Sequence, residues 1–457
     1  MSYRPPLWLI IVLSLVALLI SLVLSLRVAS QVFLQRVEGD IAAAGLPTRP
    51  EHLLTTDLAL ERGRQERVRN LMAAPSRGWP NVDLGRVGEL QALSEETRAK
   101  LTKDRTLMDP VMGDLGALLD AGPISLAALD LTDPQEVRDH PHQAIRFDMP
   151  TATLMSSRQA MQAAAWDARQ DPRVGLRRQD QLIKAWTHTH LVIDTMIAIA
   201  LSEQRDLTYV WLATRGHLPK DLATAWEAEP PPQVRWAAEG FAGERVLFWG
   251  VALRQQLMVI ALSELGSDPL SRVGAVLTWP IMPADFASGM GALAQVEARI
   301  RGQPALPSSD LPFIGQGPIT RISMANLEEG VISAGLAAHS HRVRRLFGWI
   351  ARHHAATGAV PDVATLPPAL TAATPDTPAL TMEVLGPHRI RVGPVVGAPP
   401  PRLVPASRWP DPNGGPLLGS PALRTVAKVG RMTMEVDLQQ VLQPPPPPSV
   451  KRTKAVP

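Results

Sequence analysis

Residues Leu7–Leu26 read LWLIIVLSLVALLISLVLSL, twenty consecutive positions without a charge, a proline or a glycine. In an α-helix that rises about 1.5 Å per residue, this run covers about 30 Å, which matches the hydrocarbon core of a bilayer. The run therefore predicts a transmembrane helix over 7–27, a cytoplasmic head over 1–6, and a large remainder attached to the membrane.

The length of this run and its flanks indicate whether the helix stays on the protein. A cleaved signal peptide is the alternative, because Val28-Ala29-Ser30 offers a small-residue cleavage site. Signal peptides have apolar regions of only about 7–15 residues, so the longer run favours an uncleaved anchor. Arg4 precedes the run and Arg27 follows it, so charge alone hardly decides the orientation. Since a short head is easily retained in the cytoplasm, we expect an inner-membrane protein whose soluble part lies in the periplasm.

Small residues form a stripe on the predicted membrane helix. Ala17, Ser21 and Ser25 recur every four positions, and such stripes let two helices approach closely in lipid. Self-association through these residues is one interpretation. The other is that serine is simply tolerated in a strongly apolar span.

The composition limits the classes of function. The chain has no cysteine, which excludes disulfides, thiolate zinc sites and cysteine nucleophiles. Its 46 basic and 43 acidic residues give a net charge of +3, too even a balance to predict nucleic-acid binding. The part beyond the membrane helix is long enough for two or three domains with their own cores.

Prolines and glycines divide this remainder into segments, and apolar periodicity predicts a mainly α fold. The expected order is a juxtamembrane helical and irregular region over 28–150, an all-helical domain over 151–302, a linker over 303–326, a small α+β module over 327–440, and a disordered proline-rich tail over 441–457.

Apolar residues at three- and four-residue spacing predict the helices of 151–302. These are expected over Ser157–Arg169, with Ser157 as the cap, over Gln179–Thr214, and over 240–265 and 284–301. Tryptophans at helical spacing are more typical of a core than of a ligand cage. We therefore expect a core position for Trp166, Trp186, Trp211, Trp226, Trp236 and Trp249.

The module begins with a long helix over Leu327–Ala356, followed by strands over 380–385 and 388–396. The word TMEV occurs at Thr381–Val384 and again at Thr433–Val436, which predicts a third, similar strand. Because a two-stranded hairpin is marginal in water, the helix must cover the sheet. The apolar residues expected to meet are Val331, Ile332, Val343, Leu346, Phe347 and Ile350 of the helix with Met382, Val384, Ile390 and Val392 of the strands.

Histidine pairs are the candidate metal ligands of this chain. They occur at His140 and His142, His188 and His190, His339 and His341, and His353 and His354. Residues two apart on a helix point in different directions, whereas chelating pairs are four apart. We therefore predict no metal site.

Other candidate sites are equally weak. Gly289-Met290-Gly291 lacks the remaining glycine and the preceding strand of a dinucleotide site, so no cofactor is expected. The segment HSHRVRRLFGWIARHH, His339–His354, is rich in arginine. We interpret it as a packed helix whose arginines face water, with a helix lying on anionic lipid as the alternative.

The region after the long helix has an ordered set of turn residues. Thr357-Gly358-Ala359-Val360-Pro361 is followed by Leu366-Pro367 and by Pro375-Asp376-Thr377-Pro378 ahead of the strands. With the N-terminal helix and helical body, this order resembles a group of uncharacterised bacterial single-pass membrane-anchored proteins. Residues 330–398 are similar to the C-terminal half of type II secretion pseudopilins, although the chain has no pilin-type processing site before its apolar run. The resemblance implies a fold and a link to a secretion or pilus-like system, and assigns no site residues.

No catalytic residue follows from these patterns. We expect a non-enzymatic scaffold or assembly component of the cell envelope, held in the bilayer by Leu7–Leu26 and bound to other envelope proteins. The alternative is a membrane-tethered hydrolase whose site is assembled from dispersed residues.

Overall fold

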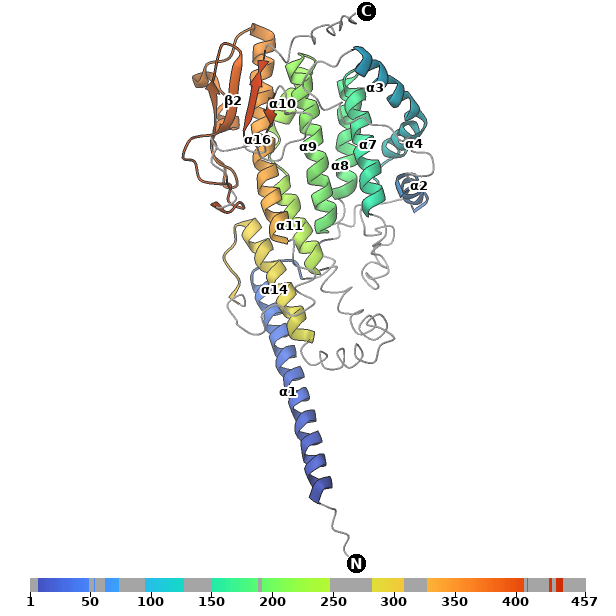
Figure 1. Ribbon diagram of the computed structural model, residues 1–457, viewed down its shortest axis with the longest axis vertical. Helices are drawn as coiled ribbons and strands as arrows, with labels where there is room; N and C mark the ends of the chain where they lie inside the picture. Colours follow the sequence, from blue (N-terminus) through green and yellow to red (C-terminus); the bar gives the residue numbers. More distant parts are fainter. Residues whose placement is uncertain are drawn as a thin grey trace, which may run out of the picture.

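A computed structural model describes residues 7–48, 53, 62–73, 95–126, 150–187, 191–246, 282–307, 327–406, 409, 427–429 and 433–438. The described part is mainly helical, as predicted, with a long N-terminal helix, a bundle and a small sheet on one side of the bundle (Figure 1). The predicted head 1–6 and tail 441–457 lie outside the described residues, as does Trp249.

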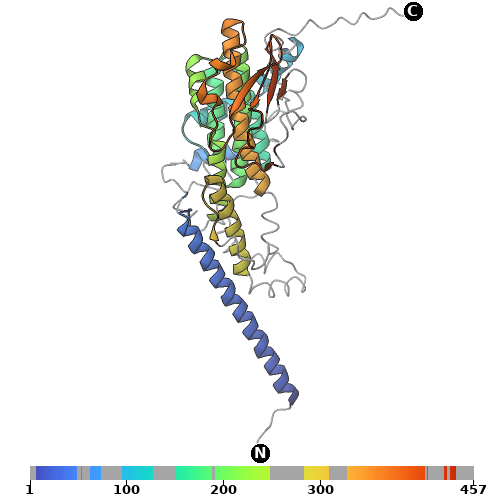
Figure 2. The ribbon, with the colours of Figure 1, turned by 90° about the vertical axis from the view of Figure 1, so that its left-hand side faces the viewer.

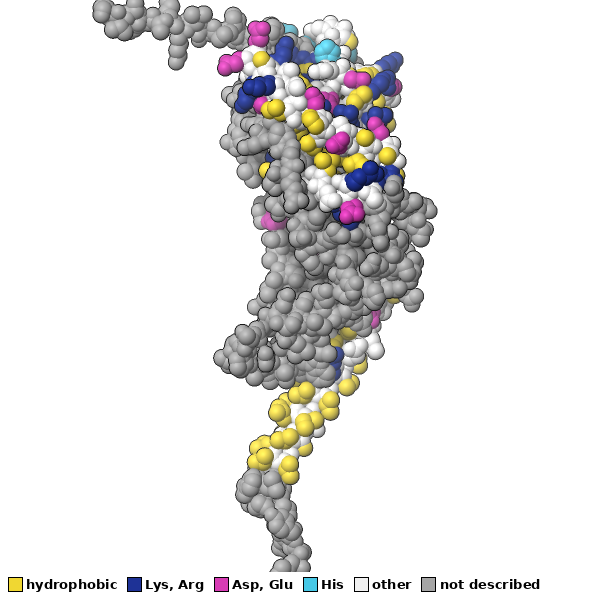
Figure 3. All heavy atoms as spheres, turned by 90° about the vertical axis from the view of Figure 1, so that its right-hand side faces the viewer, with side chains coloured by type: hydrophobic (Ala, Val, Ile, Leu, Met, Phe, Trp, Pro, Cys, Tyr) yellow, Lys and Arg dark blue, Asp and Glu magenta, His cyan; other side chains and the backbone are white. Residues whose placement is uncertain are grey.

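The apolar run belongs to a helix that is longer than a bilayer requires. Helix α1 covers Leu7–Ala43, and it is the only described helix long and apolar enough to cross a membrane. It leaves the body obliquely, and apolar side chains are exposed along its free part (Figures 2 and 3). The helix ends where the amide of Leu46 binds the carbonyl of Ile41 and Gly45 adopts a φ of +70°, which glycine tolerates best.

The last turns of α1 are part of the body. Leu34, Val37 and Ile41 are buried in one cluster with Phe286 and Leu293 of helix α14, which covers Met282–Arg301. These positions follow three- and four-residue spacing, so one stripe of α1 faces α14. A single helix therefore connects the predicted membrane span to the folded body.

Within 151–302, the described residues are mainly helical, as predicted, and several helix boundaries differ from the predicted ones. Helix α7 begins at Pro150, a favoured first helical residue, so Ser157 is not a cap but lies buried inside the helix. The expected helix Gln179–Thr214 is two helices, because Leu191 has an extended backbone. The helix expected from 240 begins at Gln233, and 247–281 is outside the described residues. The bundle helices are α7 (Pro150–Ala168), α8 (Pro172–Thr187), α9 (Val192–Thr214), α10 (Lys220–Ala228), α11 (Gln233–Gly243) and α14, flanked by α2 (Arg62–Ala73), α3 (Glu95–Leu107) and α4 (Asp109–Asp120).

The tryptophans divide into two groups. Trp166, Trp186 and Trp226 are buried, as predicted. Trp211 and Trp236 are only partly buried against the core. The indole of Trp186 donates to the hydroxyl of Ser157 at 3.0 Å, which explains how a serine is accommodated inside α7.

The long helix and the hairpin are present as predicted. Helix α16 covers Leu327–Thr357, and strands β1 (Leu380–Val384) and β2 (Arg389–Pro394) pair antiparallel. The second TMEV word forms β4 (Met434–Asp437), which pairs with β2 and places Val436 opposite Ile390. The sequence did not indicate β3 (Ala427–Val429), which completes the order β1-β2-β4-β3. Between α16 and β1 lie η5 (Val363–Thr365) and α17 (Pro368–Thr371).

The contact between α16 and the sheet is confirmed for most of its predicted residues. Three predicted residues do not join the sheet: Val384 is exposed at the end of β1, Val331 packs with the α1–α14 cluster, and Ile332 is buried outside the cluster that contains the sheet. The same core also contains residues of α9, such as Val210 and Leu212, so α16 is covered on one side by the sheet and on another by α9. The residues joined to the sheet in one cluster are Val343, Leu346, Phe347 and Ile350 with Met382, Ile390, Val392, Met434 and Val436.

Candidate functional site

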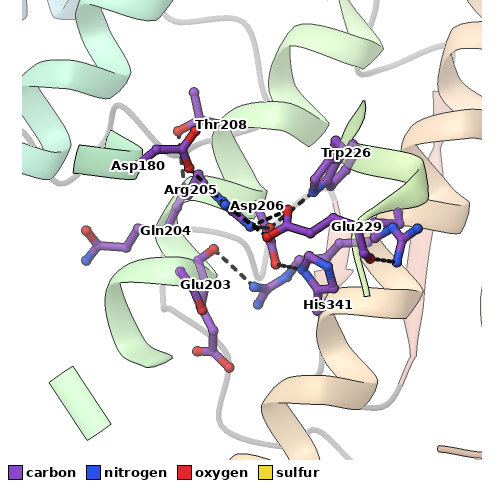
Figure 4. A network of polar contacts seen from close by, with 12 residues as sticks. Asp180, Glu203, Gln204, Arg205, Asp206, Thr208, Trp226, Glu229 and His341 are labelled. Carbon is purple, nitrogen blue, oxygen red and sulfur yellow. Dashed lines mark hydrogen bonds and ion pairs between the residues drawn. The ribbon is translucent and has the colours of Figure 1, made fainter. Parts of the chain in front are cut away.

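Helices α9 and α16 run side by side through the body, and their facing surfaces carry charged residues (Figures 1 and 4). On α9 these are Arg205 and Asp206, and on α16 they are His341, Arg344 and Arg345. All five are buried. Because charges are rarely buried without partners, this network is the most unusual chemical feature of the described chain.

Asp206 is at the centre of the network. Neither its side chain nor that of His341 has any exposed surface. One carboxylate oxygen lies 2.7 Å from Nδ1 of His341, and the other accepts a hydrogen bond from the indole of Trp226 at 3.2 Å (Figure 4). Burial raises the pKa of Asp206, but the charge and hydrogen bond of His341, together with Arg205 and Arg344, outweigh it and lower the pKa to about 2. The carboxylate is therefore ionised at any physiological pH.

Arg205 joins two further elements to this centre. Its guanidinium lies 2.8 Å from Asp180 of α8, 3.0 Å from Glu229 after α10, and 3.5 Å from Asp206. Burial opposes the charge, but these three carboxylates raise its pKa further above the ordinary arginine value. Arg205 is thus a fixed cation that connects α8, α9 and the end of α10.

The arginines of α16 do not face water, contrary to the sequence interpretation. Arg344 donates to the carbonyl of Glu203 at 3.0 Å, and Arg345 donates to the carbonyl of Glu229. Arg342 points the other way and binds the carbonyls of Leu370 and Pro378 at 3.2 and 2.9 Å. The arginine-rich segment is therefore the polar interior of the body, and neither a wet face nor a lipid-binding face.

The two members of the pair His339 and His341 are separated, as their spacing predicts. His341 faces Asp206, whereas His339 lies edge-on to Trp409 with ring centres 5.2 Å apart. His140, His142, His188 and His190 are outside the described residues. Within the described residues, no group of three or more His, Asp or Glu side chains is gathered where it could hold a metal ion. Gly289-Met290-Gly291 lies inside α14 and does not form a loop.

A second buried ion pair fixes the end of α1. Arg245, just after α11, donates to the carbonyl of Pro47 at 2.6 Å and to Glu297 of α14 at 2.6 Å. Glu297 also accepts from Arg301 at 2.9 Å. The turn that follows α1 is therefore tied to two other elements through one guanidinium.

The chemistry available to the central network follows from its burial. A His–Asp contact of this kind can serve as a general base in a hydrolase, but only where a substrate reaches the imidazole. Here the pair is sealed on all sides, and Nε2 of His341 is itself buried, with no hydrogen-bond partner among the described residues. Buried charges with specific partners fix the register of packed helices. This is the role that the geometry supports.

Comparison of the chain with family models, with characterised proteins and with solved structures finds no match. The similarity of 330–398 to pseudopilins therefore rests on the sequence pattern alone.

Sequence reasoning did not identify Arg205 and Asp206 as a site. The available signal was a pair of charged residues between apolar stretches of the helix Val192–Thr214, which also contains Asp194 and Glu203. Since His341 lies 135 positions from Asp206, no local pattern could have joined them.

Proposed function

We propose that this protein is a single-pass, membrane-anchored scaffold of the cell envelope that holds a rigid body at a set distance from the bilayer. The observation that carries the proposal is the continuity of α1, whose first part is apolar and exposed and whose last turns are buried in the body. A flexible linker would leave the body free to move relative to the membrane, whereas a shared helix does not.

The length of α1 gives the scale of this arrangement. The helix continues from Leu26 to Ala43, which adds about 25 Å beyond the membrane span at about 1.5 Å per residue. Arg245 and Glu297 then fix the turn after α1 to the body. Because Leu34, Val37 and Ile41 on this extension are already packed in the body, most of the added length anchors the helix, and the body would be presented to partners at a constant height close to the membrane.

Catalysis is not part of this proposal because the contact between His341 and Asp206, which most resembles a catalytic pair, is buried away from solvent. A hydrolase would need His341 and Asp206 to reach a substrate, yet neither has exposed surface. Their contacts instead join α9, α10 and α16, which supports a structural role.

The partners proposed for this scaffold are the lipid bilayer and other envelope proteins, and not nucleic acid. The similarity of 330–398 to pseudopilins favours partners from a secretion or pilus-like assembly. Ala17, Ser21 and Ser25 are exposed on α1, which supports self-association within the membrane.

Single cysteines test the anchor and its orientation, because the native chain has none. Val396→Cys, at a position 82% exposed, should react with a membrane-impermeant maleimide on the periplasmic side of intact inner membranes. Ser2→Cys, in the head, should react only after the membrane is opened. Ala351→Cys, at a buried position, is the control that should stay unlabelled.

The same samples test cleavage. After alkaline carbonate washing, the full-length chain should remain in the membrane pellet. Recovery of a soluble protein beginning near Gln31, or labelling of Ser2→Cys from the periplasmic side, would refute the anchored arrangement.

A further inference from the structure

Two histidines meet where α16 ends and the β1–β2 hairpin turns. His354 lies in the last turn of α16, and His388 lies in the turn between β1 and β2. Their ring centres are 5.8 Å apart with the planes nearly perpendicular. His354 is only 6% exposed, so the contact is part of the packing between the helix and the sheet.

The nitrogens of this pair have unusual surroundings. Both ring nitrogens of His354 and Nδ1 of His388 are buried without a hydrogen-bond partner among the described residues. A neutral imidazole has one donor and one acceptor, whereas the protonated ring has two donors and a full charge. An unpaired buried charge is far more costly than an unpaired neutral group. The packing therefore favours a neutral ring at His354.

Within the part of the chain that the structure describes, no carboxylate forms an ion pair with His354. Arg352 of α16 is paired with Glu227 of α10, and Arg389 of β2 is paired with Glu435 of β4. Asp437 lies opposite Arg389 across the β2–β4 pair. His353, the other titratable neighbour on α16, stacks on Trp349.

Two opposing effects act on the protonation of His354. The C-terminal end of a helix favours a positive charge. Burial, followed by the neighbouring His388 and His353, opposes it, and the pKa of His354 is lowered. Burial and the two other histidines therefore outweigh the helix end.

We propose that His354 and His388 form a pH-sensitive contact that holds the β1–β2 turn against the end of α16 at neutral pH and releases it on acidification. At a pH well above the ordinary histidine pKa of about 6.5, the ring of His354 is neutral in the closed and released forms, and the contact is complete. As the pH falls through that value, the released form takes up protons more readily than the closed form. The closed form is then progressively disfavoured.

Two carboxyl groups lie near this contact, and their contributions to the pH response have to be distinguished from that of the histidines. Burial raises the pKa of Glu435, but its hydrogen bonds with Arg389 and Arg391 lower it overall, so this group stays ionised in the relevant range. Burial raises the pKa of Glu227 above its ordinary value despite Arg352. Variants of the histidines keep Glu227. A pH response that these variants abolish therefore comes from the histidines and not from Glu227.

The test uses the full chain with a nitroxide label on Val384→Cys, which lies at the exposed end of β1 beside the turn. Between pH 7.5 and pH 5.0, the label should change from mainly immobile to mainly mobile in the electron paramagnetic resonance spectrum. A label on Val396→Cys, beyond the other end of the hairpin, should not change. His354→Gln and His388→Gln should each abolish most of the pH-dependent change at Val384→Cys.

A control variant and a second measurement distinguish this contact from other causes of a pH response. His217→Gln removes a histidine that stacks on Trp211 instead, and this variant should keep the wild-type pH response. Between pH 7.5 and pH 5.0, the wild-type melting temperature should fall more than that of His388→Gln, because protonation opposes the closed contact only in the wild type.

Three results would overturn the proposal. One is an unchanged label at Val384→Cys over this pH range. Another is a full pH response in both histidine variants. The third is a melting temperature raised by zinc in the wild type but not in His388→Gln, which would make the pair a metal site.

Discussion

Replacing Asp206 by asparagine removes one negative charge from the centre of the buried network and keeps the shape of the side chain. Two magnitudes bear on its effect. The pKa of Asp206 falls from 3.8 to about 2 on folding, and since one unit is about 1.4 kcal/mol, the ionised carboxylate contributes about 2 kcal/mol through linkage alone. Removing one member of a buried ion pair costs about 3–5 kcal/mol, because the remaining charges lose their partner.

We expect the larger range for Asp206→Asn. An amide presents a donor as well as an acceptor to Arg205, Arg344 and His341, so the variant adds a repulsive contact that simple protonation does not. Urea unfolding of the detergent-solubilised full chain, followed by circular dichroism, measures the loss as a lower midpoint. Asp221→Asn is the matched control, because Asp221 pairs with Arg173 on the surface and its loss should leave the midpoint unchanged.

The pH dependence gives an independent check of the same reasoning. A carboxyl with a lowered pKa contributes stability that is complete above 3.8 and is lost as the pH falls through about 2. Wild-type stability should therefore fall over this range more steeply than that of Asp206→Asn. Equal midpoints for Asp206→Asn and Asp221→Asn would refute a stabilising role for the network.

The elements that the sequence predicted well are those with strong local signals. The apolar run identified α1, and the three- and four-residue spacing identified α14 and α16 nearly to their ends. Alternation placed Ile390 and Val392 on the buried face of β2, and Arg389 and Arg391 on the other. These features depend on neighbouring residues, so a local pattern contains the necessary information.

The arginines of α16 show what such a pattern cannot contain. A helix with Arg342, Arg344 and Arg345 has the composition of a surface helix, and only the surrounding fold makes it internal. The groups that compensate these charges are carboxylates and carbonyls from α9, from α10 and the residue after it, from α17 and from the loop before β1. Because those partners are more than twenty positions away in the chain, burial of the arginines follows from tertiary packing and not from sequence periodicity.

Three further predictions concern packing and the attachment of the stalk. A Cβ at Gly348 would lie 2.5 Å from the ring of Trp226, so Gly348→Ala should lower the melting temperature, whereas Gly39→Ala, in open space on α1, should not. Arg245→Met removes the contact with Pro47 and Glu297, so the distance distribution between spin labels on Val32→Cys and Val396→Cys should broaden; Arg235→Met, an exposed arginine paired with Glu239, should leave it unchanged. The last prediction is that residues 327–440 do not fold alone. The face of α16 that packs on α9 would be exposed in the fragment, and Arg344 and Arg345 would lose the carbonyls of Glu203 and Glu229. The isolated fragment should therefore show no cooperative thermal transition by circular dichroism, and co-expression with 150–246 should restore one, because that piece supplies α8, α9 and α10. A sharp transition in the isolated fragment would mean that the sheet alone stabilises α16 and that the ionic network is dispensable for this part of the fold.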